Sequence, residues 1–303
     1  MLNSNIHIIG IGLEKCGTTT AFEILSTDTN VMAPQNKETF FFNRHFNKGY
    51  EYYRSLYPSN KPISIDITPS YHLDHEALQR IATYPGPKRV VLFLRDPIQR
   101  AFSLYRHDIF HHFATGHKTI GTDGQLFKNP HNRHFYSYAN SFNYYFVNLA
   151  TLMDTLKSLF KEDDLLIVYF DEIRSGDFLT KIEASIGYKL NTNKRIGWAN
   201  KSKQLFYEYS SVNFQANGIK LPPSSSSSYI FKLMRQGYNP IVWRDTDISQ
   251  DQIISALAAS QYWTQYVTES EYDDIFNRLY KNMDLESYGL ETNRIFDRKF
   301  MRV

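Results

Sequence analysis

A chain of 303 residues and 35.5 kDa is long enough to bury one large core. Its hydrophobic content of 42% and aromatic content of 16% exclude a globally disordered chain. The formal net charge of +3 suits a small anionic ligand but is too low to favour a nucleic-acid-binding face, so we expect no nucleic-acid partner.

The number of cysteines and the hydropathy of the sequence indicate in which compartment the protein is expected. The single cysteine, Cys16, excludes an intramolecular disulfide and a cysteine-based zinc site, and this usage fits a reducing compartment. No apolar run approaches the roughly 18–20 residues that a membrane helix needs. The first residues lack the basic and apolar regions of a signal peptide. We therefore expect a cytoplasmic protein without membrane insertion, whose oligomeric state has no signal in the sequence.

Four short apolar runs predict strands at residues 6–11, 63–67, 90–94 and 165–170. Each run is continuous rather than alternating, which is typical of strands covered on both faces. Apolar residues at helical spacing follow the first and third runs and precede the fourth. This alternation predicts an α/β fold with a central, mostly parallel sheet flanked by helices.

The pattern weakens beyond about residue 188. A serine run at 224–228 predicts an exposed loop, and segments 249–266 and 270–285 predict two closing helices. No internal repeat is visible. We predict a single domain spanning residues 1–303.

A loop rich in glycine and threonine follows the first predicted strand. Gly12, four further residues and Gly17 precede three threonines, which is the outline of a phosphate-binding loop at a helix N-terminus. A nucleoside-triphosphate loop carries lysine directly after the second glycine. In this chain that position is Thr18, and the lysine, Lys15, lies inside the loop. The pattern therefore favours a shorter anion with one phosphate and one further acidic group.

A second basic position, Arg95, ends the third predicted strand. Asp96 and Pro97 are typical of the first turn of a helix, so Arg95 is expected at the carboxyl end of the strand, where open α/β sheets bind ligands. Segment 89–105 resembles the 3′-phosphate-binding segment of sulfotransferases that use 3′-phosphoadenosine 5′-phosphosulfate (PAPS). The resemblance implies that Arg95 and Ser103 bind the 3′-phosphate of this donor.

The same resemblance implies a P-loop-like sulfotransferase fold and roles for the first loop. Lys15 is expected at the bridging oxygen, where it neutralises the charge that grows as the sulfur–oxygen bond breaks. The threonines and the backbone are expected to hold the 5′-phosphate. The residues implied to bind the donor are Lys15, Cys16, Gly17, Thr18, Thr19, Thr20, Arg95 and Ser103.

Segment 36–43 resembles the heparan-sulfate and bacterial carbohydrate class of sulfotransferases, in which a glutamate removes the acceptor's proton. Glu38 matches that glutamate, and we expect it to be buried against the neighbouring aromatic residues. His45 is the alternative base. Ile67 stands where this class carries a lysine, so a second cation would have to come from elsewhere, such as Lys37. The resemblance implies a glycan or small-molecule acceptor.

Other positions match the family less well. Phe170 falls where many relatives carry a tyrosine near the adenine. Relatives also have a later basic loop at the 3′-phosphate, for which Lys194 with Arg195, or Arg235, are candidates.

The predicted activity is in-line transfer of a sulfuryl group from PAPS to a hydroxyl or amine, leaving 3′-phosphoadenosine 5′-phosphate (PAP). No metal is expected, because neither a carboxylate pair nor a zinc-like histidine spacing stands out. The alternative is a P-loop kinase or nucleoside triphosphatase acting on a small molecule, for which Asp66 could hold Mg²⁺. A third interpretation is a binding module that keeps the nucleotide pocket without activity.

Overall fold

The structure, a computed structural model, describes residues 6–58, 60–104, 146–192 and 267–296. The chain divides into two compact units, each made of segments that are separate in the sequence. The first unit contains residues 1–100, 147–199 and 282–297, and the second contains residues 101–146, 200–281 and 298–303. The single domain expected from the sequence stays a prediction.

The described part of the first unit is built on a parallel sheet with the strand order β2-β3-β1-β4-β5. The strands are β1 (Ile6–Gly12), β2 (Val31–Met32), β3 (Ile63–Ile67), β4 (Lys88–Leu94) and β5 (Leu165–Tyr169). The predicted α/β class with a mostly parallel sheet is confirmed. The two-residue β2 is too short to leave a pattern in the sequence.

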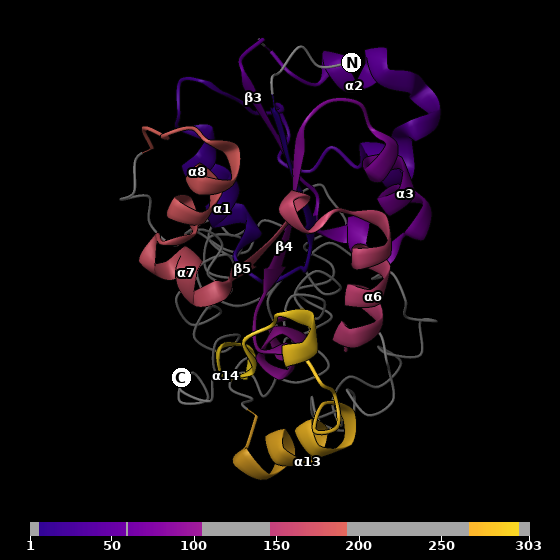
Figure 1. Cartoon of the computed structure of the whole chain (residues 1–303), viewed down its shortest axis with the longest axis vertical. Helices are drawn as coiled ribbons and strands as arrows, with labels where there is room; N and C mark the ends of the chain where they lie inside the picture. The colour runs from indigo at the N-terminus through magenta and orange to yellow at the C-terminus, as the bar shows by residue number, and fades with distance from the viewer. Residues whose placement is uncertain (1–5, 59, 105–145, 193–266, 297–303) are drawn as a thin grey trace, which may run out of the picture. The chain divides into compact units, whose positions relative to one another are not determined.

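Helices cover both faces of this sheet. Figure 1 shows α1 (Thr18–Ser26) and α8 (Phe178–Ile186) on one side, and α3 (His75–Thr83) and α6 (Leu149–Leu159) on the other. Every residue of β3 is buried as a consequence, which explains why its sequence runs apolar without alternation. Helix α6 buries Leu149, Leu152 and Leu156 at helical spacing, and Asn148 caps it by accepting from the Thr151 N–H at 3.0 Å.

The structure describes further helices and single turns. The other helices are α2 (Gly49–Ser55), α7 (Phe170–Ser175), α14 (Thr292–Ile295) and, in the second unit, α13 (Glu269–Leu279). Single turns occur at η1 (Phe41–His45), η2 (Phe46–Lys48), η3 (Pro69–Leu73), η7 (Glu162–Asp164) and η9 (Glu286–Tyr288).

Two predicted boundaries are wrong. Phe170 opens helix α7 instead of ending the last strand, and the closing helix ends at Leu279 rather than near residue 285. Segments 224–228 and 249–266 lie outside the described residues. Across the ranges that the structure describes, no helix combines the length and the apolar character needed to cross a bilayer.

A buried histidine makes the stability of the first unit depend on pH. His7 on β1 is 4% exposed, and its Nδ1 lies 2.7 Å from the Ser64 hydroxyl on β3. Burial lowers the pKa of His7 from 6.5 to about 4, and the charge of Lys88 acts in the same direction. Between these values the unfolded chain binds a proton that the folded chain does not. The free energy of unfolding therefore falls as the pH falls, by up to about 3 kcal/mol.

We predict that His7→Asn reduces the loss of unfolding free energy at acidic pH, because asparagine can keep a hydrogen bond to Ser64 but does not titrate. Urea unfolding between about pH 7 and pH 5 measures it, and the variant should lose less stability across this range than the wild type. His75→Asn, at an exposed histidine of α3, is the matched control and should keep the wild-type slope. Identical slopes for the wild type and His7→Asn would contradict the prediction.

Candidate functional site

The glycine–threonine loop and Arg95 lie together at the carboxyl ends of two neighbouring strands. β1 ends at Gly12, and β4, which pairs with it, ends at Leu94. The guanidinium of Arg95 donates from Nη1 to the Lys15 carbonyl oxygen at 3.3 Å. The two anion-binding segments predicted from the sequence are therefore in direct contact, at the edge of the sheet where open α/β folds bind ligands.

The loop leads into an uncapped helix. Gly17 is the N-cap of α1, with φ of 83°, and it has no side chain with which to cap the helix. The first turn of α1 contains no acidic residue. First-turn N–H groups have no acceptor within a helix and, with the helix dipole, favour a bound anion. Thr18, Thr19 and Thr20 form this turn, so the residues present fit a phosphate group.

Glycine is required at the start of the loop. Gly12 has φ of 152°, and a Cβ atom there would lie 2.4 Å from His72 Nδ1 and 2.8 Å from the Pro69 carbonyl oxygen. The turn η3, which follows β3, therefore packs directly against the loop. Lys15 also has a positive φ, of 64°, which is uncommon for a residue with a side chain.

The cysteine of the loop is inert. Cys16 is fully buried, and burial raises the pKa of its thiol to about 12. The side chain is therefore a protonated, apolar-like core group at neutral pH, and only its backbone is suited to contact an anion.

Arg95 lies among other cations. Its guanidinium is 4.3 Å from the centre of the Phe170 ring, in a cation–π arrangement. Burial lowers the pKa of Arg95; the negative charge of Asp96 acts against this shift, while the charges of Arg174 and Arg100 act with it. An arginine nevertheless stays protonated at neutral pH, so a bound anion would relieve the repulsion between these groups. The sequence pattern alone did not predict a role for Arg174. It lies four residues after Phe170, on the same face of α7.

A buried charge pair supports the loop from behind. Oε2 of Glu14 lies 3.8 Å from Nη1 of Arg100 and 3.8 Å from Nε2 of His72. Arg100 is 1% exposed, and His72 is 8% exposed. Burial lowers the pKa of His72, so the charge of Glu14 is balanced mainly by Arg100 at neutral pH. These contacts join the loop to the segments that follow β3 and β4.

A pocket of about 490 Å³ contains both candidate bases. Its lining residues are Gln35, Asn36, Glu38, Thr39, Phe40, His45, Tyr52 and Leu56. The expected burial of Glu38 among aromatic residues is wrong: its side chain is 36% exposed, and Oε1 pairs with Nζ of Lys37 at 2.9 Å. Lys37 thus lies beside the carboxylate.

A buried carboxylate anchors this pocket to the sheet. Asp66 on β3 is 1% exposed and accepts hydrogen bonds from four hydroxyl groups. The donors are Thr39 at 2.7 Å, Thr68 at 2.8 Å, Tyr71 at 2.9 Å and Tyr53 at 3.0 Å. Burial raises the pKa of Asp66, while these hydrogen bonds act against the rise. The carboxylate fixes the residue after Glu38, and its oxygens already have partners, so it is a poor candidate for holding Mg²⁺.

The other predicted site residues are placed less directly. Ser103 lies in the helical stretch 97–104 but belongs to the second unit, so its position relative to Arg95 is not defined. Lys194, Arg195 and Arg235 lie outside the described residues. Among the side chains that the structure describes, no three or more metal-ligating groups come together.

Part of the chain is similar to known sulfotransferases. It is 36% identical over 97 residues to human heparan sulfate glucosamine 3-O-sulfotransferase 3B1, which is 31% of this chain and 25% of that protein. It is 30% identical over 107 residues to the bifunctional heparan sulfate N-deacetylase/N-sulfotransferase 1 of Caenorhabditis elegans, covering 33% of this chain and 13% of that protein. The chain therefore spans a quarter or less of these curated relatives. The resemblance to the heparan-sulfate class is confirmed for this part of the chain.

Solved structures are less similar. A sulfotransferase from Alicyclobacillus acidocaldarius has a TM-score of 0.47 and 16% identity, covering 80% of this chain and 100% of that chain. Mouse sulfotransferase SULT7A1 in complex with PAP has a TM-score of 0.40 and 13% identity, covering 94% and 88% of the two chains. No protein-family model matches the chain.

Proposed function

We propose that the chain is a sulfotransferase that moves a sulfuryl group from PAPS to a hydroxyl or amine acceptor. The observation that carries this proposal is the 3.3 Å contact between Arg95 and the Lys15 carbonyl, which joins a guanidinium to a phosphate-type loop. PAPS has anionic groups at its 5′ and 3′ ends, so it needs two such sites side by side. The 36% identity to a heparan sulfate 3-O-sulfotransferase over 97 residues supports the same reaction.

The donor side divides into two binding functions. The first-turn N–H groups and hydroxyls of Thr18, Thr19 and Thr20 hold the 5′-phosphate. Arg95 holds the 3′-phosphate, for which a guanidinium is well shaped; for Ser103 the same role rests on the sequence resemblance alone. Lys15 neutralises the charge that develops on the bridging oxygen when the sulfur–oxygen bond breaks and PAP leaves.

The acceptor side is the pocket at Glu38. Glu38 takes the proton of the acceptor hydroxyl or amine while the new bond to sulfur forms, and His45 is the alternative base in the same pocket. The pocket combines the apolar surfaces of Phe40, Tyr52 and Leu56 with these polar groups. Such a lining suits a sugar or another small molecule with an apolar face and a hydroxyl group. Nζ of Lys37 lies 2.9 Å from Oε1 of Glu38, so a cation stands beside the proposed base.

We predict that Arg95→Ala weakens PAP binding by roughly 10- to 100-fold, because a charged hydrogen-bonding partner of the 3′-phosphate is lost. The affinity for adenosine 5′-phosphate, which lacks that group, should fall far less. Isothermal titration calorimetry measures both affinities. The exposed Arg54→Ala is the matched control. Equal weakening of the two nucleotides would show that Arg95 does not recognise the 3′-phosphate.

We further predict that Glu38→Gln lowers kcat by about 100-fold or more while leaving the affinity for PAP unchanged, because glutamine cannot accept the acceptor's proton. Transfer of labelled sulfate from PAPS to a panel of glycans, phenols and lipid alcohols measures the rate. His45→Gln is the comparison in the same pocket. Full activity of Glu38→Gln with loss of activity in His45→Gln would assign the base to His45.

A further inference from the structure

Helix α7 supports the candidate donor site with one of its faces. Phe170 lies 4.3 Å below the guanidinium of Arg95. Phe170 and Ile173 also pack against the loop, since a Cβ atom on Gly17 would lie 3.5 Å from Phe170 Cδ2 and 3.1 Å from Ile173 Cδ1. Residues 170, 173 and 174 share this face by helical spacing. The position of α7 therefore decides where the Arg95 side chain and the end of the loop can lie.

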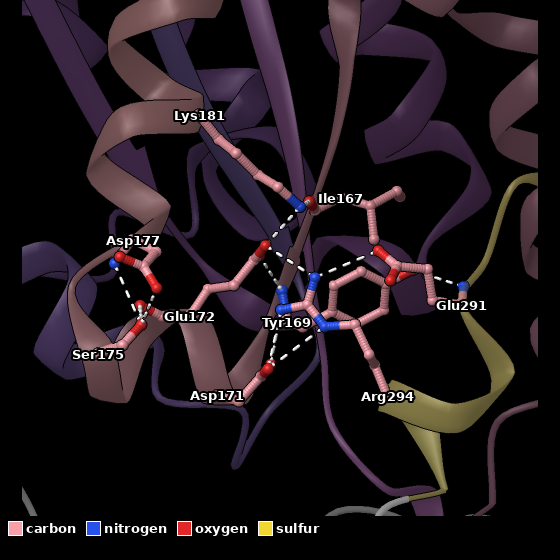
Figure 2. A network of polar contacts seen from close by, with 9 residues as sticks. All are labelled: Ile167, Tyr169, Asp171, Glu172, Ser175, Asp177, Lys181, Glu291 and Arg294. Carbon is pink, nitrogen blue, oxygen red and sulfur yellow. Dashed lines mark hydrogen bonds and ion pairs between the residues drawn. The ribbon is translucent and has the colours of Figure 1, made fainter.

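Asp171 and Glu172 lie off that face by helical spacing. Their side chains meet Arg294 of α14, which is more than 120 residues later in the chain (Figure 2). Arg294 donates to both carboxylate oxygens of Asp171, with Nη2 at 3.0 and 2.9 Å, and Nε donates at 3.2 Å. Its Nη1 donates to Oε1 of Glu172 at 3.0 Å. The guanidinium plane also covers the Tyr169 ring, at 4.3 Å. The side chain of Asp171 is 51% exposed, whereas that of Glu172 is 8% exposed, so the guanidinium links a bidentate contact at the surface to a buried carboxylate of the same helix.

The cluster around Arg294 carries more carboxylates than cations. Glu291 contributes a third carboxylate, 3.2 Å from Nη1 of Arg294, and its backbone N–H donates to the Tyr169 hydroxyl at 2.8 Å. Lys181 supplies the other cation, 2.6 Å from Oε1 of Glu172. The side chain of Glu172 is 8% exposed. Removing Arg294 would leave three neighbouring carboxylates, one of them buried, while Lys181 would still pair with Glu172. Such an imbalance is costly, and a movement of α7 would relieve it.

We infer that Arg294 is a positioning residue for the 3′-phosphate site: by holding Asp171 and Glu172 it fixes α7, and Phe170 at the start of α7 fixes the guanidinium of Arg95. This inference rests on the proposed function, because it assigns to Arg294 an effect on the recognition of PAP. It goes beyond that function because it gives the segment that contains α14 a part in the selectivity for the donor. Arg294 does not need to touch the nucleotide.

A positioning role and a purely structural role give different results. If Arg294 acts through Arg95, its loss should weaken the binding of PAP more than that of adenosine 5′-phosphate. The loss should also have little further effect once Arg95 is gone. If Arg294 only stabilises the fold, its loss should lower the melting temperature and change both affinities by the same factor. A double-mutant cycle separates the two cases.

The experiment measures PAP and adenosine 5′-phosphate affinities by calorimetry for the wild type, Arg294→Ala, Arg95→Ala and the double variant. We expect Arg294→Ala to bind PAP about 10-fold more weakly, with adenosine 5′-phosphate changed less than about 3-fold. In the Arg95→Ala background, Arg294→Ala should change PAP affinity by less than about 2-fold. Arg294→Lys, which keeps the charge but loses the bidentate contact, should show the same selective loss and covers the case in which Arg294→Ala fails to fold. The control is Lys189→Ala, which removes an exposed ion pair with Glu183.

Additive effects of the two substitutions, or equal weakening of both nucleotides, would overturn the inference and leave the proposed function standing. Unchanged affinities in both Arg294 variants would overturn it as well. A wild-type chain that does not prefer PAP to adenosine 5′-phosphate would instead contradict the proposed function, and the inference with it.

Discussion

The site depends on the hydrogen bond between the guanidinium of Arg95 and the carbonyl oxygen of Lys15. The two residues come from the ends of paired strands, β4 and β1, and the contact brings together the two segments that we propose to bind the anionic groups of the donor. The acceptor of this hydrogen bond is the backbone carbonyl oxygen of Lys15, not its side chain. A ligand that bridges the two segments finds its binding groups already spaced, so little ordering is needed when it binds.

Positive charges that lie close together repel one another, and the surrounding residues offset this repulsion. Glu14 lies against the buried Arg100, and the face of the Phe170 ring lies against Arg95. On the proposed acceptor side the buried charge is negative: four hydroxyl groups donate hydrogen bonds to the carboxylate of Asp66 and stabilise it. These arrangements stabilise charge inside the first unit and keep the loop and the pocket in fixed positions. Preorganised charges of this kind are what an electrostatically assisted transfer requires.

The sheet and the first loop could be predicted from the sequence because their signals are local. Continuous apolar runs marked four of the strands, and the spacing of Gly12 and Gly17 marked the loop. The supports of the site could not be predicted, because Glu14 with Arg100 and Asp171 with Arg294 are far apart in the sequence and meet only after folding. The exposure of Glu38 differs from the prediction for a different, local reason: its neighbours Phe41 and Phe42 are buried, while its own side chain pairs with the adjacent Lys37.

The most direct test of the account is a crystal structure of the protein with PAP. The account predicts one PAP molecule whose 5′-phosphate lies at the first turn of α1, within hydrogen-bonding distance of the N–H groups after Gly17, and whose 3′-phosphate contacts the guanidinium of Arg95. PAP bound with its 3′-phosphate away from Arg95, or with neither phosphate at the loop, would contradict the claim that one donor joins the two segments.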